Sequence, residues 1–291
     1  KKLSINNNFM NNNAPIGIFD SGVGGLTVAH AIADLLPHEN IIYFGDTAHL
    51  PYGDKSAEAI QHYSTKITDF LLQRQCKLIV IACNTAASVA FRLLKNYLAD
   101  KKVPLINVIE PVVREVVEAS FQHVGIIATK RTIQTGIYPA TLQYLQPQLQ
   151  TTAKATHALV TLIEEGLHHN KKVLEAMIEH YLSDPDFDTI EGLILGCTHY
   201  PIIKQDIARY FEVHRPNSLV PKIYDSTETV ARRVKVVLET QNLLNTQQQT
   251  PQYHFYVSDY TAAFEQITAT FFGQKINLAH FPIWEMPILD N

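Results

Sequence analysis

The chain alternates short apolar runs with stretches of helical spacing, and this alternation is the feature that most restricts its fold. The apolar runs are rich in β-branched residues and are bounded by loop residues, as strands are. We expect strands at residues 16–19, 41–44, 78–82, 103–108, 124–128, 192–195 and 253–257. Between the first two runs, Leu26, Ala29, Ala33 and Leu36 share one face of a predicted helix. Strands that alternate with helices favour a mainly parallel sheet covered on both faces, so we expect an α/β fold.

The length predicts two domains, because 291 residues exceed the size at which one hydrophobic core usually stops growing. Two prolines within His214–Lys222 indicate a linker, and a second boundary is expected near residues 101–104. We therefore expect residues 14–107 plus 223–291 to form a first, discontinuous α/β domain and residues 108–222 to form a second. The Asn-rich residues 1–13 lack any periodicity and are expected to form a disordered N-terminal extension.

Composition excludes several classes of partner. A formal charge of −4 gives no electrostatic reason to expect nucleic acid. No apolar run reaches the roughly 18 residues of a membrane span, so we expect a cytoplasmic protein without membrane association. The three cysteines lack CxxC spacing, which disfavours both a disulfide framework and a structural zinc site, and no metal site is expected.

One pattern occurs twice. "LIVIACNTAA" (78–87) and "GLILGCTHYP" (192–201) each build an apolar run that ends in a cysteine and polar residues. Open parallel sheets bind ligands beyond the carboxyl ends of their strands, where Cys83 and Cys197 should lie. A helix N-terminus near each cysteine is expected to lower the thiol pKa from its usual value of about 8.5. The matching positions also suggest two pseudo-symmetric domains, with the active site in the cleft between them.

Two thiols that face one cleft are suited to paired proton transfer. If one sulfur removes a proton from a carbon and the other supplies a proton to the opposite face, the carbon is inverted. A thiol hydrolase using Cys197 and His199 is an alternative, but on an extended loop these two side chains should point apart. A non-catalytic amino-acid-binding protein is another alternative, and it would need neither thiol. Cys76 precedes its strand, so we expect it to be structural.

Five motifs carry a resemblance to a known family: "GIFDSGVGG" (17–25), "GDTAHLPYG" (45–53), "ACNTA" (82–86), "GCTHYP" (196–201) and "YDS" (224–226). In this order they resemble the glutamate racemases, within the cofactor-independent aspartate and glutamate racemase superfamily. The histidine of "GCTHYP" favours glutamate over aspartate racemases. An aspartate racemase, or another carbon-acid racemase or decarboxylase of the same superfamily, is the alternative.

The resemblance implies racemisation of glutamate without pyridoxal phosphate or any other cofactor, supplying D-glutamate for peptidoglycan, in a homodimer. It implies that Cys83 takes the α-proton from D-glutamate and Cys197 takes it from L-glutamate. Asp20 would be the acid–base group that sets the protonation state of Cys83, and His199 with Glu164 would do the same for Cys197. Glu165, next to Glu164, is the alternative to it.

The resemblance also implies a substrate-binding set, made of Ser21, Tyr52, Gly53, Asn84, Thr85, Thr129, Thr132 and Thr198. Neutral donors of this kind can hold carboxylates and stabilise developing negative charge. Asp46 matches the family as well, although a loop cap would explain it equally. The single tryptophan, Trp284, is expected to be a packing anchor for the C-terminal residues.

Overall fold

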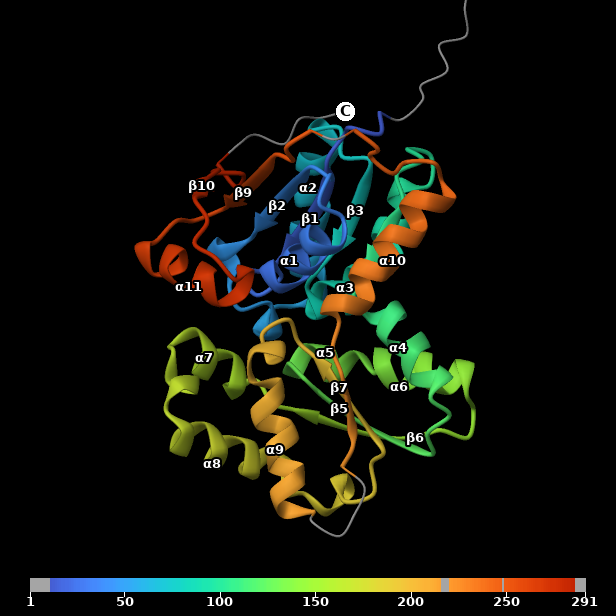
Figure 1. Cartoon of the computed structure of the whole chain (residues 1–291), viewed down its shortest axis with the longest axis vertical. Coiled ribbons are helices and arrows are strands. Elements are labelled where there is room, and N and C mark those ends of the chain that lie inside the picture. The colour runs from blue at the N-terminus through green and yellow to red at the C-terminus, as the bar shows by residue number, and fades with distance from the viewer. Residues whose placement is uncertain (1–10, 216–219, 248, 286–291) are drawn as a thin grey trace, which may run out of the picture.

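The structure is a computed structural model that describes residues 11–215, 220–247 and 249–285. It has the expected α/β fold, with two parallel sheets that occupy the upper and lower halves of Figure 1. The larger sheet has the order β10 (Leu278–His280), β9 (Tyr253–Val257), β2 (Ile41–Gly45), β1 (Ile16–Asp20), β3 (Leu78–Ile81) and β4 (Leu105–Asn107). The smaller sheet has the order β6 (Gln150–Ala155), β5 (His123–Ala128), β7 (Gly192–Gly196) and β8 (Lys222–Tyr224).

The two sheets repeat one topology, as expected for a pseudo-symmetric fold. The order β2-β1-β3-β4 in the larger sheet recurs as β6-β5-β7-β8 in the smaller sheet. Each of these strands pairs with its neighbour in parallel. Cys83 follows β3 and Cys197 follows β7, so the two cysteines follow equivalent strands.

Helices cover the larger sheet on both faces, and every residue of β1, β2 and β3 is buried. The helices α1, α10 and α11 pack together, and α2 packs on α3 (Figure 1). These helices are α1 (Leu26–Leu35), α2 (Ala57–Gln73), α3 (Asn84–Leu98), α10 (Thr227–Thr240) and α11 (Ala262–Phe272). Two 3-10 turns, η1 (Thr47–His49) and η2 (Tyr52–Asp54), follow β2.

The smaller sheet is surrounded by six further helices within the described residues, and most residues of β5 and β7 are buried. They are α4 (Ile109–Glu118), α5 (Lys130–Thr135), α6 (Ile137–Leu145), α7 (Ala158–Glu164), α8 (Lys171–Leu182) and α9 (Lys204–His214), with the 3-10 turns η3 (Leu167–His169), η4 (Pro185–Phe187) and η5 (Tyr200–Ile203). Among the described residues, no helix is long and apolar enough to cross a membrane.

Three strands were not predicted from the sequence. β6 reads "QTTAKA" and is partly exposed, so it has no apolar run to reveal it. β8 and β10 have three residues each, which is too short for a clear alternation of apolar and polar residues. The predicted strands themselves all form, although β4 is shorter than residues 103–108.

The expected domain boundaries stay a prediction, and two observations bear on them. β8 pairs with β7, so residues 223 and 224 belong to the smaller sheet although the expected boundary lies before them. Residues 216–219 of the expected linker, and residues 1–10 of the expected N-terminal extension, lie outside the described residues. Asn12 and Asn13 are held in place: the Lys77 Nζ donates to the Asn12 carbonyl, and the Asn40 amide donates to the Asn13 carbonyl at 2.8 Å.

Candidate active site

The two sheets meet where loops from their carboxyl ends touch. Thr85, at the start of α3, shares a hydrogen bond with Thr129, which follows β5, with 2.9 Å between the hydroxyl oxygens. The Thr27 hydroxyl lies 3.4 Å from the carbonyl oxygen of Thr198. Gly24 packs so closely on this second loop that a Cβ there would lie 2.6 Å from the His199 ring. Polar residues of both sheets are thus brought into one enclosed region.

Asp20 ends β1 and is fully buried. One carboxylate oxygen accepts hydrogen bonds from the backbone N–H groups of Gly22 and Gly25, both at 3.1 Å, and the other has no partner. Burial raises the pKa of Asp20, although the charge of His199, the hydrogen bonds from Gly25 and Gly22, and the nearby Cys83 side chain oppose the shift. A buried carboxyl group with a raised pKa and a free oxygen can exchange a proton with a neighbour.

Cys83 is the N-cap residue of α3 and is 5% exposed. Its sulfur accepts from the Ala86 N–H at 3.4 Å and donates to the Ser21 hydroxyl at 3.5 Å. Burial raises the pKa of Cys83 to about 12, and repulsion by Asp20 adds to the shift. The expectation that the helix N-terminus lowers this pKa is therefore wrong, because desolvation outweighs the helix dipole. At neutral pH Cys83 is a thiol.

Cys197 has different surroundings. No α-helix begins beside it; the short turn η5 follows, capped by His199. Its sulfur lies 3.7 Å from Nδ1 of His199, and Nε2 of His199 lies 2.9 Å from the Glu164 carboxylate. Cys197 and His199 therefore contact each other. The expectation that they point apart is wrong, because His199 has a helical and not an extended backbone.

The His199 side chain is positively charged at neutral pH. Burial lowers its pKa, but the bonds with Cys197 and Glu164 and the attraction of their charges raise it more, to about 10. Nδ1 of this ring faces the Cys197 sulfur, and Nε2 faces the Glu164 carboxylate. The two equivalent cysteines thus have different electrostatic surroundings: the Asp20 carboxyl group disfavours charge on Cys83, whereas Cys197 faces the His199 ring.

The other expected substrate-binding residues lie around these two groups. The hydroxyl of Thr132 lies 3.0 Å from that of Thr129 and 3.3 Å from that of Thr85. A Cβ at Gly53 would lie 3.3 Å from Thr129, which places the η2 turn beside the same hydroxyl groups. The Tyr52 hydroxyl donates to Asp46 at 2.7 Å.

Tyr138, on α6, was not identified from the sequence because nothing in its local pattern marks it. Its hydroxyl donates to Oδ1 of Asn84 at 2.6 Å. Both residues are 2% exposed, and the Nδ2 group of Asn84 has no partner. With its oxygen occupied, the Asn84 side chain can only donate, and an anionic ligand can accept that bond.

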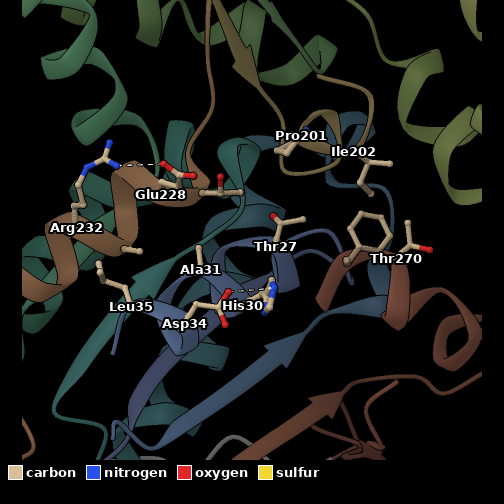
Figure 2. Close-up of a pocket in the computed structure, with 13 residues that line it drawn as sticks. Thr27, His30, Ala31, Asp34, Leu35, Pro201, Ile202, Glu228, Arg232 and Thr270 are labelled. Atoms are coloured by element: carbon tan, nitrogen blue, oxygen red, sulfur yellow. Dashed lines mark hydrogen bonds and ion pairs between the residues drawn. The ribbon is translucent and has the colours of Figure 1, made fainter. Parts of the chain in front are cut away.

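Figure 2 shows a pocket of about 650 Å³ that borders this region without including either cysteine. Its walls carry two ion pairs, His30 with Asp34 on α1 and Arg232 with Glu228 on α10 (Figure 2). Phe271, which also lines the pocket, packs edge-on against His199 with ring centroids 5.1 Å apart. In the part of the chain that the structure describes, no group of three or more His, Cys, Asp or Glu residues could hold a metal ion.

Comparison with known proteins decides the family. The family model described as Asp/Glu/Hydantoin racemase matches residues 26–234. The chain belongs to this racemase family. A curated glutamate racemase from Syntrophus aciditrophicus is 41% identical over 276 residues, which cover 92% of this chain and 97% of that protein.

Solved structures of this racemase family superpose over nearly the whole chain. Glutamate racemase from Francisella tularensis, in complex with D-glutamate, is 35% identical with a TM-score of 0.84, covering 94% of this chain and 98% of that one. Glutamate racemase from Thermus thermophilus, in complex with beta-chloro-D-alanine, is 37% identical with a TM-score of 0.82, covering 95% and 100%. The fold and the amino-acid racemase class thus agree with what the five motifs predicted.

Of the two adjacent glutamates, Glu164 contacts His199, whereas Glu165 is exposed. Replacing Glu164 with Gln should lower the pKa of His199 below about 10, because the variant removes a negative charge that favours the imidazolium. We expect a kcat about tenfold lower in both directions and a loss of about 1 to 2 kcal/mol of stability at pH 7. Because the folded-state pKa of His199 is raised, this loss should be present near pH 7 and fade as the pH rises through about 10. Urea unfolding and polarimetric kinetics at several pH values measure both effects, and Glu165→Gln, the matched control, should change neither.

The role of Tyr138 can be tested by removing only its hydroxyl. Tyr138→Phe frees the Asn84 amide to rotate, so we expect the KM for both glutamate enantiomers to rise about tenfold, the value of one hydrogen bond to a charged ligand. Tyr144, 84% exposed on the same helix, provides the control Tyr144→Phe, which should leave KM unchanged. An unaltered KM in Tyr138→Phe would show that Asn84 does not need this partner.

Proposed function

We propose that this racemase interconverts L- and D-glutamate by a two-base mechanism in which Cys83 and Cys197 act on opposite faces of the α-carbon. The curated glutamate racemase named above supports glutamate over aspartate as substrate. One observation carries the mechanism: equivalent strands of a repeated topology are each followed by a cysteine, and the two sulfurs have different ionisable neighbours, Asp20 and His199. Inversion needs one base and one acid at the same moment, which such a pair provides.

In the direction from L- to D-glutamate, the Cys197 thiolate removes the α-proton while the His199 imidazolium holds the sulfur in place. The Cys83 thiol gives its proton to the other face of the carbon. The protonation states are then exchanged, and the reverse reaction can start from D-glutamate. Before the next turnover in the same direction, Cys83 must gain a proton and Cys197 must lose one. His199 releases a proton to solvent past Glu164 and then takes the proton of Cys197, and Asp20 passes a proton from solvent to Cys83.

The substrate is held by neutral donors around the two sulfurs. The free Nδ2 group of Asn84 and the hydroxyl groups of Thr85, Thr129, Thr132 and Thr198 bind the carboxylates, and Asp20 with Ser21 binds the ammonium group. Fixed donors of this kind stabilise the charge that develops when the α-proton leaves. The cysteines are only 5% and 6% exposed, so the cleft must open for substrate to enter.

D-glutamate is a component of peptidoglycan, and we propose that this enzyme supplies it. A cytoplasmic location is consistent with this role, since both thiols must stay reduced. We also propose that the protein forms a homodimer, as its resemblance to the glutamate racemases implies. Light scattering of the purified protein tests this oligomeric state.

A thiol hydrolase is the second candidate, because Cys197 and His199 are in contact. It leaves the second, equivalent cysteine without a role. Circular dichroism of solutions of pure L-glutamate and, separately, pure D-glutamate distinguishes the two functions. Racemisation brings both signals to zero and incorporates one deuterium at the α-carbon in deuterated water, whereas a hydrolase would release a product of different mass. An unchanged signal from both enantiomers would reject the proposed function.

A further inference from the structure

Asp46, directly after β2, is a fully buried carboxylate surrounded by side-chain donors. It accepts hydrogen bonds from Tyr52 Oη and Ser258 Oγ, both at 2.7 Å, from Trp284 Nε1 at 2.8 Å and from His49 Nδ1 at 2.9 Å. These donors come from η1, from η2, from the end of β9 and from the C-terminal segment. A buried carboxylate with this many partners fixes the relative positions of all of them.

This cluster lies next to the candidate active site. The backbone N–H of Asp46 donates to the carbonyl oxygen of Asp20 at 3.0 Å, so the two carboxyl groups share a rigid backbone connection. On the other side, Tyr52 and Gly53 form the η2 turn that packs beside Thr129. Because the Tyr52 hydroxyl donates its proton to Asp46, it cannot donate to a carboxylate of the substrate, so the donors of this turn are its backbone N–H groups. The bond to Asp46 helps to fix the position of these groups.

Trp284 joins the cluster from 238 residues away in the sequence. Its ring packs edge-on against His49, with centroids 4.5 Å apart, and against Tyr63, with centroids 5.1 Å apart. A phenylalanine could provide this packing. The hydrogen bond from the indole N–H to Asp46 is a contact that phenylalanine cannot make.

We propose that Trp284 is a positioning residue for substrate binding: through its bond to Asp46 it holds the Tyr52–Gly53 turn where the backbone can bind a carboxylate of the substrate. This inference rests on the proposed function. It extends the expected role of Trp284, which was packing of the C-terminal residues alone.

The test removes the indole N–H and keeps an aromatic ring. Trp284→Phe should raise the KM for L- and D-glutamate equally, by about tenfold, and change kcat by less than about twofold, because the proton-transferring groups are untouched. Ser258→Ala removes a second donor to the same carboxylate and should likewise raise KM while leaving kcat nearly unchanged. This second variant keeps the test decisive if Trp284→Phe folds poorly.

A matched control comes from the same segment. Phe281 packs on Phe70, with ring centroids 4.7 Å apart, and its side chain makes no bond to Asp46 among the described contacts. Phe281→Leu should therefore lower the Tm and leave KM unchanged. If Trp284→Phe and Ser258→Ala behave like Phe281→Leu, the inference is overturned while the proposed function stands. A wild-type enzyme that fails to racemise glutamate would overturn both.

Discussion

Cys83→Ser and Cys197→Ser are each expected to lower kcat for racemisation by about 10³-fold or more in both directions, with little change in Tm. The serine hydroxyl has nearly the shape of the thiol, so the fold should be retained. It does not ionise near neutral pH, however, so it cannot act as the base, and it is a poor acid in the reverse step. One defective partner is sufficient to block both directions, because each turnover of the proposed mechanism uses both sulfurs.

Cys76 provides the control for this experiment. It is also buried and also has a pKa raised to about 12 by burial, but it precedes β3 and packs against Gly17. Cys76→Ser should therefore retain kcat within about twofold and lose only stability. Circular dichroism of the substrate gives kcat, and thermal unfolding gives the Tm of each variant. Full turnover by the Cys83 or the Cys197 variant would reject the two-base mechanism.

The largest effect on stability is expected at a buried ion pair. Lys77 and Glu39 are 0% and 1% exposed, with 2.5 Å between Nζ and the carboxylate. The Lys77 Nζ also donates to the carbonyl oxygen of Leu243 at 2.8 Å, so this side chain connects the start of β3 to the segment after α10. Lys77→Met would leave the Glu39 charge buried without its partner, and we expect a loss of about 3 to 5 kcal/mol in the free energy of unfolding.

Two comparisons isolate the cause of that loss. In the double variant Lys77→Met/Glu39→Gln the buried charge is removed, while the amide oxygen can still accept from the Asn245 N–H; most of the lost stability should return. The exposed pair Lys171–Asp206 gives the other comparison, since Lys171→Met should cost less than about 1 kcal/mol. Urea denaturation measures the free energy of unfolding of the three variants. A Lys77→Met variant no less stable than Lys171→Met would show that the buried pair contributes little.

The repeated topology places the cysteines symmetrically, but the groups around them are not repeated. Asp20 ends β1 beside Cys83, whereas Thr129 follows the equivalent strand β5. Cys197 is instead accompanied by His199 and Glu164, which come from η5 and α7. The two equivalent sulfurs therefore have different ionisable neighbours, Asp20 beside Cys83 and His199 beside Cys197.

Local patterns in the sequence determined much of this protein. The seven predicted strands follow from apolar runs of strand length, because such a run is a property of residues that are neighbours in the sequence. The positions of Cys83 and Cys197 after two such runs were enough to place both at the carboxyl ends of strands. The five motifs were enough to indicate the family that the comparisons then showed.

Only the tertiary structure decided which groups these residues meet. The sequence left Glu164 and Glu165 as competitors, and the choice depended on a contact across 35 residues. Tyr138 and the bond between Trp284 and Asp46 could not be found locally for the same reason. The raised pKa of Cys83 was missed because a pKa depends on burial and on charges from distant parts of the chain. The periodicity of apolar residues is a property of residues that are close in the sequence. Hydrogen-bond partners and burial are decided only when distant parts of the chain fold together.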